Sequence, residues 1–380
     1  MNIQVIDLSS PLWLQTLQKL RHDFYHLPEY IALESRRVSA IPKAILIVEH
    51  DKIFFVPYLL RQCNDIFGLE FTTSEVFDVI SPYGYAGILL SQAAANTPEF
   101  IEVAINQLKH LFHTKYVCSA FFRLHPLLNQ GFEEIYQADD CQVNGETVSI
   151  DLRLSSAEMW QQTRPEHRNN INRSKRNGIT ARIVPFQPYI KEFVEIYEET
   201  MERVGALNLY YFSIEYFLAL GDALGDKLHL CIVELGEESI CAGLFTECCG
   251  IVQYHLGGTR TNFLKQAPSK LMFNYVRDWA KERGNEVFHL GGGVGGAKDS
   301  LYHFKAGFSK QRHNFITLRL ITDQKKYLQL VNLRAKVLNT EVDKILETDF
   351  FPAYRSPNMP KIFIGAVQDT IERKNLCSDY

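Results

Sequence analysis

The chain has 380 residues, of which 46% are hydrophobic and 22% are charged, and its formal net charge is −4. This length suits two domains of ordinary size, each with its own core. The small negative charge gives no overall electrostatic reason to expect nucleic acid, although a local basic patch is compatible with it. Apolar runs such as 44–48 are far shorter than a bilayer span, and the first residues lack the features of a secretion signal. We therefore expect a cytoplasmic protein without a transmembrane segment.

The cysteines indicate a reducing compartment. The chain has eight of them, scattered and without a Cys-x-x-Cys pair. Several, such as Cys231 and Cys241, lie in apolar stretches. This distribution is typical of buried free thiols rather than of a disulfide framework or a zinc site, so we expect no metal.

Hydrophobic periodicity and turn residues in the first half predict a strand at 2–6, helices near 11–21 and 28–38, strands at 43–49 and 52–60, a helix at 98–112 and a strand at 115–120. A further strand at about 146–153 is expected to pair back into this first domain. The boundary is placed near residue 153, which gives a first domain of residues 1–153.

The second half gives a clearer pattern. It predicts a strand at 179–184, helices at 188–204 and 213–224, strands at 227–235, 239–248 and 251–257, a helix at 269–283, a strand at 286–290, a short helix and a strand at 315–321. The order β-α-α-β-β-β-α-β-α-β repeats that of the first half, which suggests a duplicated domain. Residues 154–323 form the second domain, and 324–380 are expected to be a helical arm that becomes irregular through Pro352, Pro357 and Pro360.

A glycine-rich loop follows the strand at 286–290. Five of the six residues at 291–296 are glycine, and the chain then resumes as a helix that carries Asp299, Phe304 and Lys305. Glycine permits positive φ and close approach of the backbone, so such a loop presents N–H groups to a phosphate or a carbonyl oxygen. Gly292 and Gly293 are therefore expected to contact a co-substrate. A flexible turn is the alternative for the glycines alone.

The element order, together with the motifs SPYGYAG at 81–87, RNNINRSKRNGI at 168–179, LGGTR at 256–260 and LGGG…DSLYHFKAGF at 290–308, resembles known acyltransferases. The order resembles the GNAT fold, and a tandem pair of such units resembles the FemABX peptidoglycan-bridge transferases. The resemblance implies an α/β (α+β) fold with tandem duplicated GNAT-like (acyl-CoA N-acyltransferase) domains and a C-terminal helical arm. The chain departs from it twice. Residues 188–224 leave no room for a coiled-coil arm, and the helix at 269–283 lacks the Arg/Gln-x-x-Gly-x-Gly/Ala pyrophosphate signature before it.

The same resemblance suggests catalytic residues. It places a catalytic lysine in a Phe-Lys pair, here Phe304 and Lys305, where the ammonium would stabilise an oxyanion. Asp299 and His255 are candidate bases, because each borders strand ends that line the cleft in this fold. His289 is a weaker candidate. A solvated lysine, a helix-capping Asp299 and a buried structural histidine are the ordinary alternatives.

Binding residues are expected around the same cleft. By the resemblance, Arg203 and Tyr211 would contact the diphosphate of a nucleotide-linked acceptor. Tyr83 and Tyr85 are expected either to form the far wall of the acceptor cleft or to be buried tyrosines of a turn, and Tyr254 is expected to face the same cleft. Pairing of Arg203 with Glu199 on one helix is the alternative. Ser269 and Lys270 open a long helix, whose N-terminus favours an anion. A basic stripe at Arg164, Arg168 and Arg176 either contacts phosphates or is a solvated face.

These residues together predict an N-acyltransferase. It would join an activated acyl or aminoacyl group to an amine of a peptidoglycan precursor or another sugar-linked acceptor. The co-substrate is acyl-CoA or aminoacyl-tRNA, and no tightly bound cofactor is expected. A catalytically silent GNAT-like module that binds a nucleotide-sugar or a protein partner is the alternative. The sequence leaves the oligomeric state open.

Overall fold

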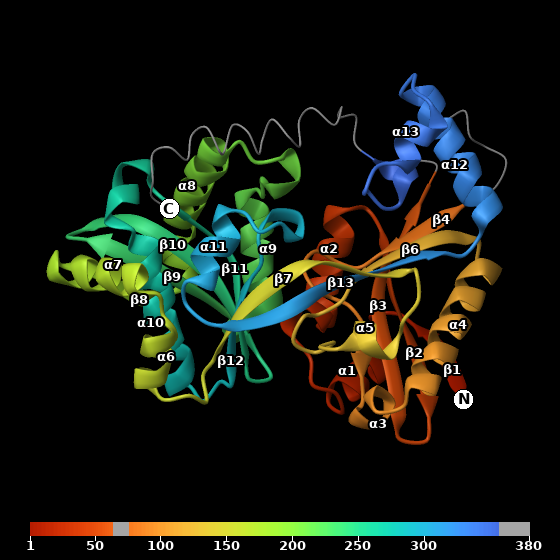
Figure 1. Ribbon diagram of the computed structural model, residues 1–380, viewed down its shortest axis with the longest axis horizontal. Coiled ribbons are helices and arrows are strands. Elements are labelled where there is room, and N and C mark those ends of the chain that lie inside the picture. The colour runs from red at the N-terminus through yellow and green to blue at the C-terminus, as the bar shows by residue number, and fades with distance from the viewer. Residues whose placement is uncertain (64–75, 357–380) are drawn as a thin grey trace. The chain divides into compact units, whose positions relative to one another are not determined.

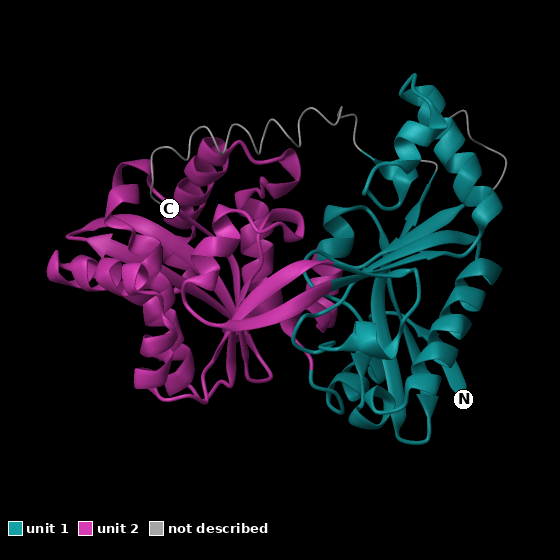
Figure 2. Cartoon of the chain, in the orientation of Figure 1, with its two compact units in different colours: residues 1–21, 34–143, 316–378 teal, residues 22–33, 144–315, 379–380 magenta. Residues whose placement is uncertain are grey.

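The computed structural model describes residues 1–63 and 76–356, and these residues form two compact units (Figures 1 and 2). Unit 1 comprises residues 1–21, 34–143 and the described residues from 316 onward. Unit 2 comprises residues 22–33 and 144–315. The predicted domain boundaries near 153 and 323 stay a prediction, and the part of the predicted arm that includes Pro357 and Pro360 lies outside the described residues.

Unit 1 is built on a sheet whose neighbouring strands are mostly antiparallel. At one side of this sheet, residues 317–321 pair antiparallel with residues 119–123, so that Thr317 lies opposite Arg123 and Ile321 opposite Ser119. Among the described strands of this unit, only β4 and β6 run parallel. The order is β1 (Asn2–Ile6), β2 (Ile41–Glu49), β3 (Lys52–Gln62), β4 (Phe77–Ile80), β6 (Val117–Arg123) and the second half of β13 (Gln311–Ile321), with β5 (Leu89–Leu90) beside β3.

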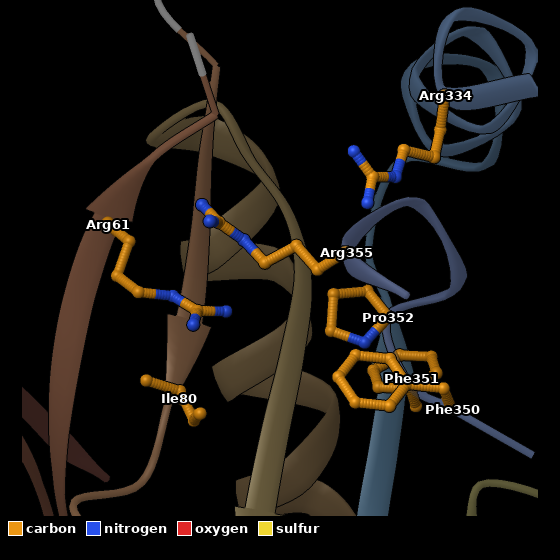
Figure 3. A pocket seen from close by; sticks show the side chains of 7 residues that line it. All are labelled: Arg61, Ile80, Arg334, Phe350, Phe351, Pro352 and Arg355. Carbon is orange, nitrogen blue, oxygen red and sulfur yellow. The ribbon is translucent and has the colours of Figure 1, made fainter. Parts of the chain in front are cut away.

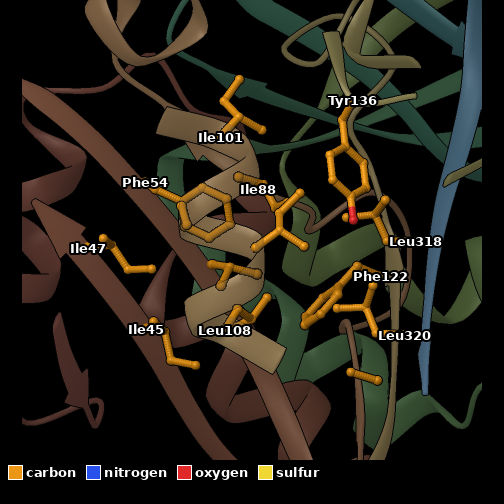
Figure 4. Packing of buried hydrophobic residues seen from close by; sticks show 14 of the residues in the cluster. Ile45, Ile47, Phe54, Ile88, Ile101, Leu108, Phe122, Tyr136, Leu318 and Leu320 are labelled. Carbon is orange, nitrogen blue, oxygen red and sulfur yellow. The ribbon is translucent and has the colours of Figure 1, made fainter. Parts of the chain in front are cut away.

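The core of unit 1 forms where helix α4 (Pro98–Thr114) lies on this sheet (Figure 4). Apolar residues recur along α4 at helical spacing, and Ile101, Leu108 and Phe112 are fully or almost fully buried. They pack with strand residues such as Ile45 and Phe54 in one cluster. Each such side chain contributes about 1.5–3 kcal/mol through burial. The other helices before residue 143 are α1 (Pro11–Leu17), α2 (Pro28–Arg37), α3 (Gln92–Ala95) and α5 (Phe132–Ile135).

The C-terminal arm packs within unit 1. It consists of α12 (Gln324–Val337), α13 (Val342–Leu346) and a 3-10 turn at Ala353–Arg355. Tyr327 and Val331 of α12 are buried in a cluster with Cys63 and Cys118. The helical arm predicted from the sequence is therefore present through residue 347.

Unit 2 repeats the same sheet pattern. Its strands follow the order β7 (Cys141–Asp151), β12 (Val287–Gly291), β11 (Ile251–Thr259), β10 (Glu238–Cys248), β9 (Leu228–Leu235) and β8 (Ile179–Val184). Residues 144–151 of β7 belong to this unit. Only β11 and β12 run parallel, and a helix connects them, as a parallel pair requires.

Helices cover both faces of this sheet. α8 (Phe186–Val204) and α10 (Pro268–Glu282) lie on opposite sides of it (Figure 1). On the α10 side, Gly243 of β10 makes room for the Met272 side chain, because a Cβ there would lie 3.0 Å from it. The remaining helices are α6 (Ser156–Gln162), α7 (Pro165–Arg176), α9 (Ile214–Leu224) and α11 (Ser300–Ala306). Ser213 caps α9 by accepting from the Tyr216 N–H, as the sequence predicts.

The predicted element order of the second half is confirmed, but two strands have other partners than expected. The strand predicted at 315–321 to complete the second domain pairs with β6 of unit 1. The strand predicted at 146–153 to pair back into the first domain pairs instead with β12 of unit 2. Local sequence patterns specify a strand without specifying its partner. None of the helices in the described ranges combines the length and apolar composition of a bilayer span.

Candidate active site in the second unit

In unit 2 the parallel pairing between β11 and β12 ends partway along β11. Their ladder consists of three residue pairs and ends at Gln253 and His289. β11 continues to Thr259 beside β10 only, and its register with β10 shifts by one residue at Tyr254–Leu256, which is a β-bulge. The edge of β11 from Tyr254 onward therefore lies outside the β12 ladder. Lys305 lies near this edge, with its Nζ 5.6 Å from the centre of the Tyr254 ring.

The glycine loop begins where β12 ends. Gly291, Gly295 and Gly296 have φ values of 78°, 62° and 91°, which only glycine adopts readily. At position 293 glycine is required because there is no room for a side chain: a Cβ there would lie 2.1 Å from the Ala297 carbonyl oxygen. The sequence thus folds this loop tightly rather than leaving it as a loose turn.

Lys305 lies under this loop. Its side chain is buried, with 6% of the residue exposed, and its Nζ donates a hydrogen bond to the Gly292 carbonyl oxygen at 2.6 Å. The ammonium also lies 5.6 Å from the centre of the Tyr254 ring. Burial lowers the pKa of Lys305 to about 8, and the charge of Asp299 only partly opposes this. The lysine is therefore not a solvated surface residue.

Phe304 anchors the helix that carries this lysine. Its ring packs edge-on against Phe273 of α10, with ring centres 5.3 Å apart. Phe273 also contacts Tyr254 at 4.8 Å and Phe308 at 5.4 Å. Phe304, Lys305 and Tyr254 are thus held together by one aromatic cluster, and the predicted Phe-Lys pair has one member that packs and one that presents a charge.

Asp299 closes the loop onto helix α11. One carboxylate oxygen accepts from the Tyr302 N–H at 2.8 Å, and the other accepts from the Val294 N–H at 2.9 Å. It is the N-cap of α11, the alternative role that its position in the sequence suggested. In this geometry Asp299 holds the loop in shape with both oxygens.

A polar cluster beside the loop is not evident from the sequence. The Tyr302 hydroxyl donates to Glu146 at 2.6 Å and accepts from Arg312 Nε at 3.1 Å. Lys298 Nζ lies 2.9 Å from the same carboxylate. The hydrogen bond from Tyr302, followed by that from Lys298, lowers the pKa of Glu146. These residues come from β7, α11 and β13, so no local motif signals them.

The two predicted histidines are both buried. His255 is neutral at neutral pH, and both ring nitrogens of His289 have hydrogen-bond partners. Burial lowers the pKa of His255 to about 4, and its ring lies edge-on to Phe24 with centres 5.4 Å apart. His289 contacts Gln253 at 2.5 Å and Thr147 at 2.9 Å through its two ring nitrogens. A neutral imidazole with such a low pKa is a weak base at neutral pH.

His167 is a third histidine close to the lysine, which sequence reasoning missed. Its Nε2 lies 2.9 Å from the Phe304 carbonyl oxygen, so this nitrogen carries the proton and donates. Gly307 makes the contact possible, since a Cβ there would lie 2.4 Å from Nε2. Burial lowers the pKa of His167 to about 4. This neutral imidazole ties α7 to the helix of Lys305.

Arg203 and Tyr211 lie farther along α8 and after it. Arg203 donates to the Thr259 carbonyl oxygen at 2.9 Å and to the Thr261 hydroxyl at 3.0 Å, so it holds the end of β11. Tyr211 is 42% exposed. Glu199, the alternative partner expected for Arg203, accepts from the Thr261 N–H at 2.6 Å.

The start of α10 carries an ion pair between a buried lysine and an exposed glutamate. Lys270 is 4% exposed, and its Nζ lies 2.7 Å from Glu166 of α7. Ser269, half-buried, precedes it in the first turn of the 15-residue helix, after Ala267 in the left-handed region. The Lys270 ammonium is therefore held by a carboxylate, and an anion at this helix end would meet the backbone and Ser269 first.

Tyr83 and Tyr85 belong to unit 1, and their predicted place in an acceptor cleft stays a prediction. Both are half-buried. The Tyr83 N–H donates to Glu34 at 3.3 Å, and its ring lies 5.8 Å from the Arg37 guanidinium. The Tyr85 ring lies 6.1 Å from that of His125.

The predicted basic stripe follows α7. Arg164 is its N-cap, and Arg168 and Arg176 follow at half-buried and exposed positions, while His167, Ile171 and Ser174 face inward. The stripe is thus on the outer side of the helix, where either expected role is available.

Two cavities lie away from these residues. One, of about 410 Å³ in unit 1, is lined by arginines and by residues of the arm, Arg61, Ile80, Arg334, Phe350, Phe351, Pro352 and Arg355 (Figure 3). The other, of about 370 Å³, lies between α10 and β8 in unit 2. The site is therefore defined by the parted strands and the buried lysine, and not by cavity size.

Comparisons with known proteins bear on the fold of this chain. Residues 165–305 match the model of the acetyltransferase (GNAT) domain family. Among solved structures, FemX matches with a TM-score of 0.65 at 13% identity, covering 87% of this chain and 99% of its own. A conserved protein of unknown function from Bacteroides thetaiotaomicron matches with a TM-score of 0.51 at 12% identity, covering 84% and 99%. A tandem GNAT protein from the clavulanic acid biosynthesis pathway has a TM-score of 0.47 at 9% identity, covering 84% and 98%.

No curated protein matches the chain by sequence. The family match lies within unit 2 and ends at Lys305. The predicted fold, with two GNAT-like units and a FemX-like arrangement of elements, is confirmed. The predicted enzyme class, an acyltransferase, is supported by the same family match.

Proposed function

We propose that this chain, an acyltransferase with a GNAT domain in its second unit, transfers an acyl group from acyl-CoA to an amine of a peptidoglycan precursor or another sugar-linked acceptor. Acyl-CoA would act as a co-substrate and not as a tightly bound cofactor. The acceptor class is suggested by the likeness to FemX. Because acyl-CoA is made and used in the cytoplasm, the reaction would take place there.

The observation that carries the proposal is the buried ammonium of Lys305. An ammonium has three N–H donors, and Gly292 is its one hydrogen-bond partner among the described residues. Burial makes each remaining donor more effective toward a negative charge, because water does not compete. A buried cation that keeps donors available beside a glycine loop is suited to an oxyanion and would be an unfavourable choice for structure alone.

The reaction needs little more than this. The neutral amine nitrogen attacks the thioester carbon, whose oxygen becomes an oxyanion that Lys305 stabilises. The C–N bond forms, the C–S bond breaks, and the proton lost by the amine ends on the sulfur of the leaving CoA thiol. The thioester is already reactive, so positioning and oxyanion stabilisation supply most of the catalysis.

The parted strands supply a place for the donor. The edge of β11 beyond Gln253 is outside the β12 ladder. An extended chain with amide groups, such as the pantetheine arm of CoA, can pair with such a strand edge as an added strand does. Its thioester would then lie near the glycine loop, and its pyrophosphate would lie toward Ser269 at the start of α10.

Aminoacyl-tRNA is the second candidate donor. The observation that favours it is the outward basic stripe on α7, at Arg164, Arg168 and Arg176. The same lysine would serve, because an aminoacyl ester also forms an oxyanion when an amine attacks it.

The first experiment is calorimetric titration with acetyl-CoA and with CoA at fixed moderate salt. Saturable micromolar binding supports acyl-CoA as donor and directs the search to amine acceptors. If neither ligand binds, charged tRNA is titrated next. A chain that binds none of these donors contradicts the proposal and leaves the catalytically silent binding module.

The mechanism is tested by Lys305→Ala, with Lys298→Ala as the matched control. Both remove a lysine near the same loop, but Lys298 is on the surface, paired with Glu146. Lys305→Ala is expected to lower turnover by about 10²–10³-fold with donor affinity nearly unchanged. Lys298→Ala should retain most of the activity. Near-normal turnover in Lys305→Ala would remove the mechanistic claim.

A further inference from the structure

A tight turn in unit 2 brings two neighbouring thiols to the same side of a hairpin. Cys248 ends β10, Ile251 begins β11, and the residues between them, Cys249 and Gly250, have φ values of 46° and 76°. Positive φ at both central residues is the mark of a type I′ hairpin turn, where asparagine or glycine is usual at the first position. Neighbouring residues in a strand point to opposite faces, so it is this turn that lets adjacent cysteines converge.

The third member of the cluster is His22. It belongs to the segment 22–33, which is part of unit 2 although it comes early in the chain. The Sγ atoms of Cys248 and Cys249 are 4.0 Å apart. Both ring nitrogens of His22 lie 3.6 Å from the Cys249 Sγ. One ligand atom from each of the three residues lies within 4.8 Å of the others.

Two of these separations match the edges of a zinc tetrahedron. With Zn–S bonds of about 2.3 Å and Zn–N bonds of about 2.0–2.1 Å, tetrahedral angles give sulfur–sulfur edges of about 3.8 Å and sulfur–nitrogen edges of about 3.6 Å. The observed 4.0 and 3.6 Å lie within a few tenths of an ångström of these values. Two thiolates and an imidazole are also the ligands that zinc prefers.

The position of Cys249 is unusual for a cysteine without a role. It is exposed and left-handed, whereas Cys231 and Cys241 are buried in the core of the same sheet. A non-glycine residue in the left-handed region carries a conformational cost, and such residues gather at functional sites. A structural cysteine would be expected in the core instead.

We propose that Cys248, Cys249 and His22 bind one Zn²⁺ ion, which ties the segment 22–33 to the β10–β11 hairpin. The two thiols lose their protons when the metal binds, and those two protons are released to solvent. The exposed side of Cys249 leaves room for a water molecule as fourth ligand. This site lies outside the acyl-transfer machinery and does not depend on the proposed function.

The test uses the full chain, reduced and freed of metal with a chelator. Zn²⁺ is titrated against a competing chromophoric chelator, and Co²⁺ provides the spectroscopic probe. We expect one equivalent of Zn²⁺ per chain and a Co²⁺ spectrum with thiolate charge-transfer bands and the visible bands of tetrahedral coordination. Hydrogen exchange of residues 22–33 should slow when Zn²⁺ is added.

Two ligand variants and one control separate this site from adventitious binding. Cys249→Ser and His22→Ala are each expected to weaken Zn²⁺ binding by more than about tenfold, since even outer-shell changes cost that much. Both should abolish the zinc-dependent protection of residues 22–33. Cys141→Ser removes a half-buried cysteine of unit 1 outside the cluster and should bind Zn²⁺ as the wild type does.

Either of two results would overturn the proposal. One is that the reduced chain takes up no stoichiometric Zn²⁺. The other is that His22→Ala binds Zn²⁺ as tightly as the wild type, which would reduce the site to an isolated pair of thiols. Thermal unfolding of Cys249→Ser is compared with that of the metal-free wild type. Equal melting temperatures show that the variant is folded, so that a loss of Zn²⁺ binding is due to the missing thiol.

Discussion

The two units use the same sheet pattern but differ at the one place where chemistry is expected. In unit 2 the parallel ladder of β11 and β12 ends after three residue pairs, and Lys305 lies buried beyond it. In unit 1 the corresponding parallel pair, β4 and β6, has a register shift between Phe77 and Asp78 but stays paired to the end of β4, where Ile80 pairs with Phe121.

Unit 1 continues this contact past the strand end. The Ser81 N–H donates to the Phe121 carbonyl oxygen at 2.9 Å, and the Arg123 guanidinium donates to the Ser81 and Pro82 carbonyl oxygens at 3.0 and 2.9 Å. Gly87 lies so close to β6 that a Cβ there would be 2.6 Å from the Leu124 Cα. The strand edge that unit 2 leaves outside the ladder is thus covered by a loop in unit 1. The same fold thus carries a candidate reactive site in one copy and a closed strand edge in the other.

The largest effect is expected from breaking the closed unit. Asp78 is fully buried, accepts from Arg61 Nε at 2.8 Å and from the Tyr354 hydroxyl at 3.1 Å, and also pairs with Arg355. Asp78→Asn removes the charge that two guanidiniums share and should destabilise unit 1 by about 3–5 kcal/mol. Hydrogen exchange should locate the loss in unit 1, and the folded protein should retain its donor affinity. Loss of protection in unit 2 alone would contradict this assignment.

The next effect concerns the glycine loops of the two units. Gly293→Ala would place a Cβ 2.1 Å from the Ala297 carbonyl oxygen and 2.3 Å from Asp299, so the loop over Lys305 must shift. A displacement of about 1 Å near the reacting atoms can lower turnover about a hundredfold. Gly87→Ala in unit 1 is the matched change, and it should lower the melting temperature with little effect on the turnover of folded enzyme. Steady-state kinetics and thermal unfolding of both variants test this difference. An equal loss of turnover in the two variants would show that the two loops do not differ in role.

A third prediction concerns stability. Burial lowers the pKa of Lys305 from 10.5 to about 8, so at neutral pH the folded state carries the cost of a buried charge. Lys305→Met should therefore stabilise unit 2 by about 1–3 kcal/mol at pH 7. The sign with pH follows from proton binding: between about 8 and 10.5 the unfolded chain holds more protons, so wild-type stability rises with pH there and the gap to Lys305→Met narrows. Urea unfolding of both proteins at pH 7 and at a pH between 8 and 10.5 measures the two stabilities. A stability difference that widens with pH would refute the prediction.

The smallest effect is the pH dependence of the reaction. If the Lys305 ammonium stabilises the oxyanion as proposed, turnover with a pre-bound donor should fall by about tenfold per pH unit above about 8, because burial lowers the pKa of Lys305 to that value. Lys305→Arg keeps a cation at all these pH values and should lose this alkaline limb while retaining part of the activity. No residue of unit 1 is expected to alter the profile. An alkaline limb that persists in Lys305→Arg would point to another group.

Much of the second unit could be predicted from the sequence. The strand at 179–184, the cap at Ser213 and the long helix from Pro268 are local features, governed by periodicity and by residues a few positions apart. The glycine loop with Phe304 and Lys305 could be singled out for the same reason. Short strands such as β4 and β5, of 4 and 2 residues, carry too little pattern to be found.

The partners of these features were decided by tertiary structure. Lys270 lies against Glu166, which is 104 positions away, and Tyr302 against Glu146, which is 156 positions away. The cluster of His22 and Cys249 spans 227 positions. No spacing rule covers such distances, because these contacts depend on how whole helices and sheets pack.

The sequence therefore determined the order of elements, the tight glycine turn and the presence of a lysine on the helix after it. Backbone conformation and amphipathic spacing are set by neighbours along the chain. The tertiary structure decided that this lysine is buried, that the β11–β12 ladder ends at Gln253 and His289, and that β7 pairs with β12 whereas β13 pairs with β6. Burial and strand pairing are properties of the packed sheet, and they turn a common side chain into a candidate catalytic group.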